Sequence, residues 1–170
     1  MSSPFCMETI PKGKAALVRG LDSRERVLVA LAACNSDAKA GRRALYLCKG
    51  PIAIPDMERI DERILLGSYD SIEDVPGILR LLEPSFLAIN PINPSCGSAI
   101  WSGGRLISET LFGISSYVRE RGAVAIFFIE EPIAAQFGRT EPRYYGLIKK
   151  FCDLEFVFDH QRRMERSRLH

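Results

Sequence analysis

A Pro-, Ser- and Gly-rich stretch, residues 91–104, carries the residues best suited to covalent chemistry. Cys96, with Ser95 beside it, could act as a nucleophile if a neighbouring base lowered its pKa. The chain has 2 histidines, His160 and His170, and both lie close to its C-terminus. The Gly-x-Ser-x-Gly pattern of a hydrolase nucleophile does not occur. A small hydrolase or transferase is therefore an alternative, which predicts a ligand-sized pocket lined by Asn90, Ser95, Cys96 and Glu130.

Two adjacent carboxylates, Glu130 and Glu131, follow the most continuous apolar run of the chain, residues 123–129. Paired carboxylates at the end of a strand could exchange protons with a substrate. We favour a simpler interpretation, in which a solvated strand end forms salt bridges to Arg139 or Arg143. No group of His, Cys and acidic residues has the spacing of a metal site, so we expect no bound metal.

The amino-acid composition is typical of a globular protein and gives no sign of a nucleic-acid-binding or membrane protein. The 170 residues, 46% of them hydrophobic and 26% charged, fit a single globular domain over residues 1–170. The net charge of +2 gives no overall field that would favour nucleic acid or a membrane. Because transmembrane, signal-peptide and Cys-x-x-Cys patterns do not occur, we expect a cytoplasmic protein. Few Asn and Gln residues and many arginines are typical of a thermophile.

Short apolar segments alternate with helical patterns along almost the whole chain. We expect strands at residues 14–19, 43–48, 63–68, 85–90, 123–129 and 153–158, with residues 164–169 as an antiparallel edge. We expect helices at residues 22–39, 71–83, 105–121 and 145–151, a helical turn at 57–60, and an irregular turn at Pro76 and Gly77. The spacing requires crossover connections, which predicts a mostly parallel sheet covered on both faces.

Short sequence motifs along these segments match motifs of a known protein family. Residues 10–13 read IPKG ahead of the first strand, residues 41–47 read GRRALYL, and residues 63–75 read RILLGSYDSIEDV. In this order they resemble the RecA/RadA/KaiC superfamily of ATPases, over nearly the whole chain. The resemblance implies a three-layer α/β fold of RecA type, with a mostly parallel central sheet and helices on both faces. Another doubly wound α/β fold is the alternative.

The resemblance places the phosphate loop at residues 19–26, which read RGLDSRER. A working loop has glycines that let backbone amides surround the phosphates, then a lysine and a Ser or Thr that binds Mg²⁺. Here Arg24 replaces the second glycine, Glu25 stands in place of the lysine, and Arg26 stands in place of the hydroxyl. The carboxylate of Glu25 should repel phosphate.

Further family positions are also changed. The strand at 85–90 ends in Asn90, where the resemblance implies the aspartate that supports Mg²⁺. Lys49 and Gly50 stand where it implies a catalytic glutamate. We therefore expect a pseudo-ATPase with no catalytic residue and no cofactor, although an enzymatic role stays open. The degenerate nucleotide site comprises Arg19, Gly20, Ser23, Arg24, Glu25, Arg26 and Asn90.

The resemblance also suggests surfaces for partners, because loops after the strands at 85–90 and 123–129 line the DNA channel in recombinases of this family. Aromatic rings can stack on bases while arginines bind phosphates. Nearby acids, Glu130, Glu131 and Glu141, partly cancel the positive charge, so we favour protein contact over direct DNA binding. The candidate contacts are Trp101, Arg105, Arg139, Arg143, Tyr144, Arg162 and Arg163.

These observations predict a binding or regulatory role. The leading hypothesis is a non-catalytic RecA/RadA-like paralogue that contacts a RecA/RadA-type ATPase, or a second copy of itself, in DNA recombination or repair. A stand-alone nucleic-acid-binding module is a further alternative, and no membrane partner is expected.

Overall fold

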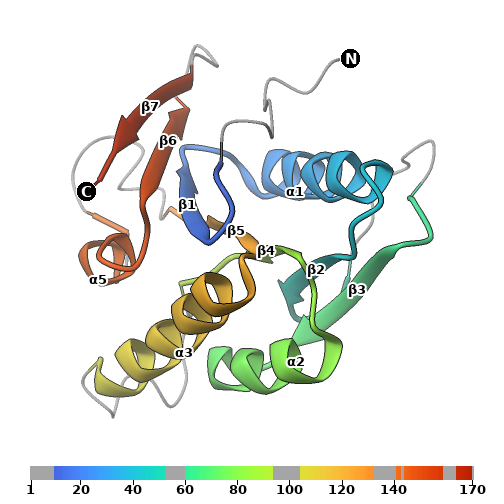
Figure 1. The fold of residues 1–170 in the computed structure, drawn as a ribbon. Coiled ribbons are helices and arrows are strands. Elements are labelled where there is room, and N and C mark those ends of the chain that lie inside the picture. Colours follow the sequence, from blue (N-terminus) through green and yellow to red (C-terminus); the bar gives the residue numbers. More distant parts are fainter. Residues whose placement is uncertain are drawn as a thin grey trace.

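The computed structural model describes residues 10–52, 60–93, 104–131, 141–142, 144–158 and 164–169. These residues form a seven-stranded sheet with the order β3-β2-β4-β5-β1-β6-β7 (Figure 1). All neighbouring strands pair in parallel except β6 and β7, which are antiparallel. The strands are β1 (Lys14–Arg19), β2 (Ala44–Lys49), β3 (Ile64–Tyr69), β4 (Phe86–Asn90), β5 (Val124–Phe128), β6 (Leu154–Phe158) and β7 (Met164–Arg168).

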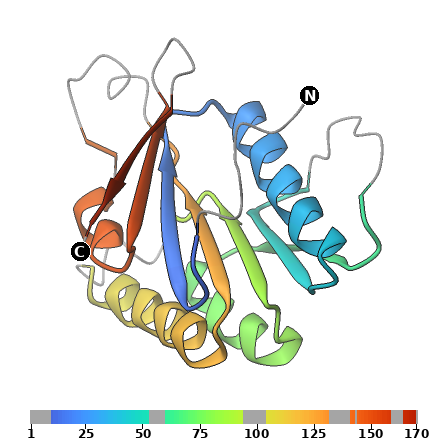
Figure 2. The same cartoon turned by 45° about the horizontal axis from the view of Figure 1, so that its top comes forward.

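Helices cover both faces of the sheet, so the fold has three layers. The helix α1 (Ser23–Lys39) packs on one face, and α2 (Val75–Leu82), α3 (Arg105–Arg121) and α5 (Tyr145–Lys149) lie on the other (Figure 2). The 3₁₀ turn η2 (Ile72–Asp74) leads directly into α2. No helix in the described part of the chain combines the length and apolar character that crossing a membrane requires.

Each central strand contributes to two apolar cores. In β1, Leu17 packs with the α3 side of the sheet, while its neighbours Ala16 and Val18 pack with the α1 side. Every residue of β4 and β5 is buried, which explains why these strands read as continuous apolar runs and do not alternate with polar residues. The helix α1 buries one side against the sheet, including Ala30, Leu31 and Cys34, and is exposed on the other side at Arg24, Leu28 and Lys39.

The α/β class, the three layers and the mostly parallel sheet are confirmed, and so is the antiparallel edge at β7. The strand β1 and the helix α3 have the expected bounds, and the ends of the other strands differ from the expected ones by at most one residue. The irregular turn expected at Pro76 instead falls before it, in η2, because proline is well tolerated in the first turn of α2. Most of the helical turn expected at residues 57–60 lies outside the described residues.

Candidate functional site

The carboxyl ends of β1, β4 and β5 meet at one edge of the sheet, together with the start of α1. The chain leaves β1 towards α1 on one face and leaves β4 towards α3 on the other. In open α/β sheets ligands bind at such a reversal point. The structure brings the predicted residues of the degenerate site to this place.

The turn between β1 and α1 is short and tightly packed. Only Gly20, Leu21 and Asp22 separate the end of β1 from Ser23. Gly20 has a φ of +86°, and a Cβ added there would lie 2.0 Å from the carbonyl oxygen of Phe158, at the end of β6. The glycine is therefore needed for a close approach between two strand ends. Because α1 already begins at Ser23, the turn is shorter than the loop that the pattern G-x-x-x-x-G-K-[ST] forms around phosphates.

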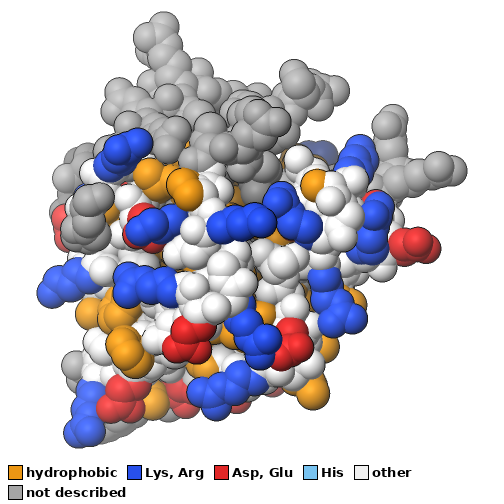
Figure 3. Space-filling model, in the orientation of Figure 1, with side chains coloured by type: hydrophobic (Ala, Val, Ile, Leu, Met, Phe, Trp, Pro, Cys, Tyr) orange, Lys and Arg blue, Asp and Glu red, His pale blue; other side chains and the backbone are white. Residues whose placement is uncertain are grey.

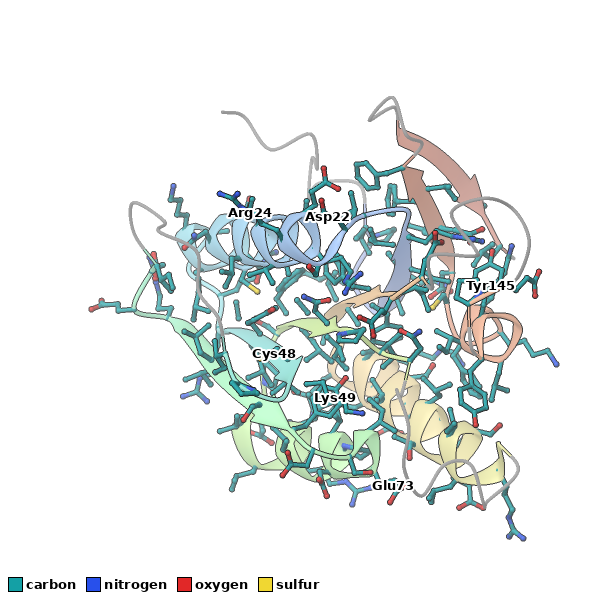
Figure 4. The ribbon with its side chains drawn as sticks, turned by 180° about the vertical axis from the view of Figure 1, so that it is seen from behind. Asp22, Arg24, Cys48, Lys49, Glu73 and Tyr145 are labelled. Carbon is teal, nitrogen blue, oxygen red and sulfur yellow. The ribbon has the colours of Figure 1, made fainter. Side chains whose placement is uncertain are left out.

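Two carboxylates cap the start of α1. The backbone amide of Glu25 donates to Oδ1 of Asp22 at 2.8 Å, and the amide of Asp22 donates to Oε2 of Glu25 at 3.1 Å. This reciprocal pair is a capping box, with acidic groups at the positive end of the helix dipole. Glu25 therefore binds a backbone amide of its own chain, in a role that the sequence analysis did not assign. Asp22 and Arg24 are exposed and point away from the sheet (Figure 4).

Arg26 is the only buried member of the sequence 23–26, with 6% of the residue exposed. Its Nε donates to Oδ1 of Asn90 at 3.0 Å, and one terminal nitrogen donates to the carbonyl oxygen of Leu21 at 3.2 Å. The other terminal nitrogen lies 3.4 Å from Oε1 of Glu130. The guanidinium thus links the start of α1 to the ends of β4 and β5.

Asn90 is itself buried, and both the oxygen and the nitrogen of its side-chain amide form hydrogen bonds. Its Nδ2 donates to the hydroxyl of Tyr46 on β2 at 3.2 Å, while its Oδ1 accepts from Arg26. Burial raises the pKa of Tyr46 to about 12, so the phenol stays protonated at neutral pH. Tyr46 was not among the predicted site residues, because within its strand it reads as one more core aromatic.

Asn93 fastens the chain after β4 to the end of β5. Its Nδ2 donates to the carbonyl oxygen of Glu130 at 2.8 Å, and its Oδ1 accepts from the amide of Glu130 at 2.9 Å. Asn93 is buried, and this paired contact is the geometry that the backbone uses between strands. It holds Glu130 in place beside Arg26.

Arg19 forms a second cationic centre at the end of β1. Its Nε lies 2.6 Å from Oε1 of Glu131, and its guanidinium lies 4.5 Å from the centre of the Tyr145 ring. The Tyr145 hydroxyl donates to the buried carboxylate of Glu155, which also accepts from Nζ of Lys149 at 3.1 Å. This network joins β1 to β6 and to α5, where Figure 4 labels Tyr145.

Both arginines keep their charge in this environment. Burial lowers the pKa of Arg26, although Glu130 opposes the shift. Burial also acts to lower the pKa of Arg19, but the contacts with Glu131 and Tyr145 outweigh it and the pKa is raised. Since an arginine pKa starts above about 12, both guanidinium groups stay protonated near neutral pH.

Glu130 and Glu131 form salt bridges, as the simpler interpretation expected, but with other partners. Their partners among the described residues are Arg26 and Arg19, whereas Arg139 and Arg143 lie outside the described part. The reason is the strand order, which places β5 directly beside β1. Two of the four residues expected to line a hydrolase pocket, Asn90 and Glu130, are thus committed to Arg26, while Ser95 and Cys96 lie outside the described residues.

The residues at this edge do not fit ATP with Mg²⁺. A protonated guanidinium contacts Asn90, the side chain that the resemblance places beside a metal ion, and this guanidinium would repel a divalent cation. The first-turn amide of Glu25 is already bound to a carboxylate, so it is not offered to a phosphate. Within the described residues, no group of three or more His, Cys, Asp or Glu side chains could hold a metal ion.

The predicted partner contacts are only partly described. Arg105 begins α3 and pairs with Glu109 at 2.8 Å, and its side chain is 87% exposed. Tyr144 directly precedes α5, whose Leu147 lies near Gly104, so the structure brings these two candidates to neighbouring elements. The remaining candidates lie outside the described residues: Trp101, Arg139, Arg143, Arg162 and Arg163.

No protein-family model matches the sequence, and no curated protein is significantly similar to it. The resemblance to RecA-like ATPases therefore stays a prediction.

Proposed function

We propose that this chain is a non-catalytic, RecA/RadA-like binding protein, in which an internal arginine occupies the place where a related ATPase would hold its metal ion. The hydrogen bond between Arg26 and Asn90 is the observation that carries this proposal. By the resemblance, these two positions correspond to the Mg²⁺-binding hydroxyl and to the aspartate that supports the ion. In this chain the two side chains bind each other.

Arg26 and Asn90, which replace the hydroxyl and the aspartate implied by the resemblance, can bind each other. An arginine can only donate hydrogen bonds, and the neutral Oδ1 of Asn90 accepts one of them. Glu130 supplies the negative charge that a buried guanidinium needs. A hydrogen bond to a charged group contributes about 1.5–3 kcal/mol, so a nucleotide would have to displace a contact that stabilises the fold.

The proposed role is to bind another macromolecule, with a RecA/RadA-type ATPase as the first candidate and DNA recombination or repair as the setting. An active ATPase reorganises its site when nucleotide binds and leaves. Here the edge of the sheet is held together by the chain's own contacts, from Arg26 to β4 and from Arg19 to β5. This supports a preformed surface that does not depend on nucleotide.

Calorimetry with ATP and Mg²⁺ tests the first half of the proposal. We expect no binding heat up to millimolar nucleotide, for ATP and ADP alike. An active RecA-type ATPase, titrated in the same buffer, is the positive control. Micromolar binding to the wild-type chain would overturn the proposal, since it would require Arg26 to leave its place between Asn90 and Glu130.

Co-elution with a purified RecA/RadA-type ATPase tests the second half. We expect a complex that forms with either ATP or ADP on the ATPase, because the chain contributes no nucleotide of its own. The hypothesis of a partner in recombination is abandoned if no complex forms and if DNA is also not retained at low salt. Retention of DNA without an ATPase, with a steep dependence on salt, would favour the stand-alone nucleic-acid-binding module.

A further inference from the structure

A groove runs between α2 and α3, on the face of the molecule opposite α1. Its volume is about 520 Å³, which is large enough for several side chains. Small residues form part of its floor. Gly113 of α3 packs against Pro76 of α2, where an added Cβ would lie 3.4 Å from the proline ring. The groove is therefore a consequence of two helices that pack closely through small side chains.

Phe112 forms one wall of this groove and is 65% exposed, although it is a large apolar side chain. It precedes Gly113 and faces away from the core that the other apolar residues of α3 join. An exposed phenylalanine beside a groove of small residues presents both a projection and a cavity on one surface. Two copies of this surface can therefore fit together, with the phenylalanine of each copy in the groove of the other.

The charged residues around the groove are also complementary to one another. Arg80 on α2 and Glu120 on α3 both line it, and neither makes an ion pair with a described residue. The other two charged residues of the lining are already paired, Glu109 with Arg105 and Arg121 with Glu83. Figure 3 shows acidic, basic and hydrophobic side chains interspersed over the part of the surface where Figure 1 places α2 and α3. Among the residues that the structure describes, Arg80 and Glu120 thus line opposite walls of the groove without an ion-pair partner.

We propose that this groove is the interface of a twofold-symmetric homodimer, with a second copy of this chain as its occupant. In a twofold interface the same surface meets itself, so a residue on one wall contacts the opposite wall of the other copy. Phe112 of each copy enters the groove of the other beside Gly113. Arg80 of each copy then pairs with Glu120 of the other, which satisfies both unpaired charges.

This inference is independent of the proposed function, because it uses no residue of the nucleotide-like site. In the dimer Phe112 would be buried in the groove of the other copy, with charged residues around it. This arrangement matches the apolar centre and polar rim of typical protein interfaces. In a twofold interface each charge must find its opposite on the same surface, and the groove lining carries both signs. The balance of one arginine and one glutamate favours a second copy.

Sedimentation velocity over a range of protein concentrations tests the proposal. We expect the wild-type chain to dimerise in the micromolar range. Phe112→Ser should weaken the dimer by about tenfold or more, because a central aromatic residue carries much of the binding free energy. Leu81→Ser is the matched control, since Leu81 is also an exposed apolar residue, 82% exposed, but does not line the groove. It should leave the dimer unchanged.

A charge-exchange experiment identifies the pairing. Arg80→Glu alone places like charges opposite each other, and so does Glu120→Arg alone, so each variant should be a monomer where the wild type is a dimer. A mixture of the two variants restores opposite charges at both contacts and should form a heterodimer. Circular dichroism checks that each exposed substitution leaves the fold intact. A wild-type chain that is monomeric at the highest concentration, or a mixture that stays monomeric, would overturn the proposal.

Discussion

Nε of Arg26 lies 3.0 Å from Oδ1 of Asn90, and this contact joins the first turn of α1 to the carboxyl end of β4. Both residues are more than nine-tenths buried. The contact therefore belongs to the interior of the protein, at the point where α/β folds commonly place a ligand.

Removal of the Arg26 guanidinium should destabilise the fold. Arg26→Met keeps much of the side-chain volume but leaves Oδ1 of Asn90 and the carbonyl oxygen of Leu21 without their donor. We expect a loss of about 2–4 kcal/mol in the free energy of unfolding, measured by urea denaturation. Arg24→Met, on the exposed side of the same helix turn, is the control and should change stability by less than about 0.5 kcal/mol.

Asn90→Asp should be tolerated far better than Asn90→Leu. A carboxylate can accept from Arg26 and from the Tyr46 hydroxyl, so both contacts survive with a reversed direction at the tyrosine. Leucine satisfies neither group and should cost about 2–4 kcal/mol. Equal thermal stability of the two variants would show that the polar contacts of Asn90 contribute nothing to the fold.

Gly20→Ala should destabilise much more than Gly41→Ala. Both glycines have a left-handed backbone, with φ values of +86° and +84°. At Gly41 no described atom lies within 4 Å of an added Cβ, so only the backbone penalty of about 1–2 kcal/mol applies. At Gly20 the Cβ would overlap the carbonyl oxygen of Phe158, and we expect about 3 kcal/mol or more in total. Similar losses in equilibrium unfolding would contradict the close approach between β1 and β6.

Asp22→Ala should cost about 1 kcal/mol, because it removes the side chain that accepts from the amide of Glu25. Asp22→Asn preserves an acceptor and should recover most of that loss. Ser23→Ala changes an exposed neighbour and serves as the control in thermal unfolding. A greater loss for Ser23→Ala would mean that the helix begins one residue later than the structure shows.

The stability contributed by Asp37 should depend on pH with an unusual sign. Burial raises the pKa of this carboxyl above its ordinary value of 3.8, despite the salt bridge to Arg42, and Oδ2 has no hydrogen-bond partner among the described residues. A raised carboxyl pKa means that the folded state binds the proton more tightly. The favourable contribution is therefore present below the ordinary pKa and is lost as pH rises through the folded-state pKa.

Asp37→Asn removes this titration. Relative to the wild type, the variant should gain stability as pH rises above the ordinary carboxyl pKa, because the asparagine carries no buried charge. Arg42 is 44% exposed on its side chain and can be hydrated when its partner is removed. Urea denaturation at several pH values measures the difference. A variant that loses stability relative to the wild type as pH rises would contradict the sign of the shift.

The sequence predicted the elements well because each has a local signature. The apolar runs at Lys14–Arg19 and Val124–Phe128 are bounded by turn residues, and α3 has a clear apolar stripe. The capping box is also predictable from the sequence, because Asp22 and Glu25 stand three residues apart at a helix start. The sequence pattern alone does not show that Glu25 accepts from the amide of Asp22, because that contact depends on the conformation of the turn.

The chain itself determined which residue types stand at the positions that the resemblance assigns to the site, namely Glu25, Arg26 and Asn90. It also determined the order and type of the elements, since these follow from local periodicity. Only the tertiary structure decided what replaces the missing groups. Arg26 meets Asn90, and Arg19 meets Glu131, because the strand order places β5 between β4 and β1. The groove beside Phe112 likewise required two helices, far apart in the sequence, to pack on one face.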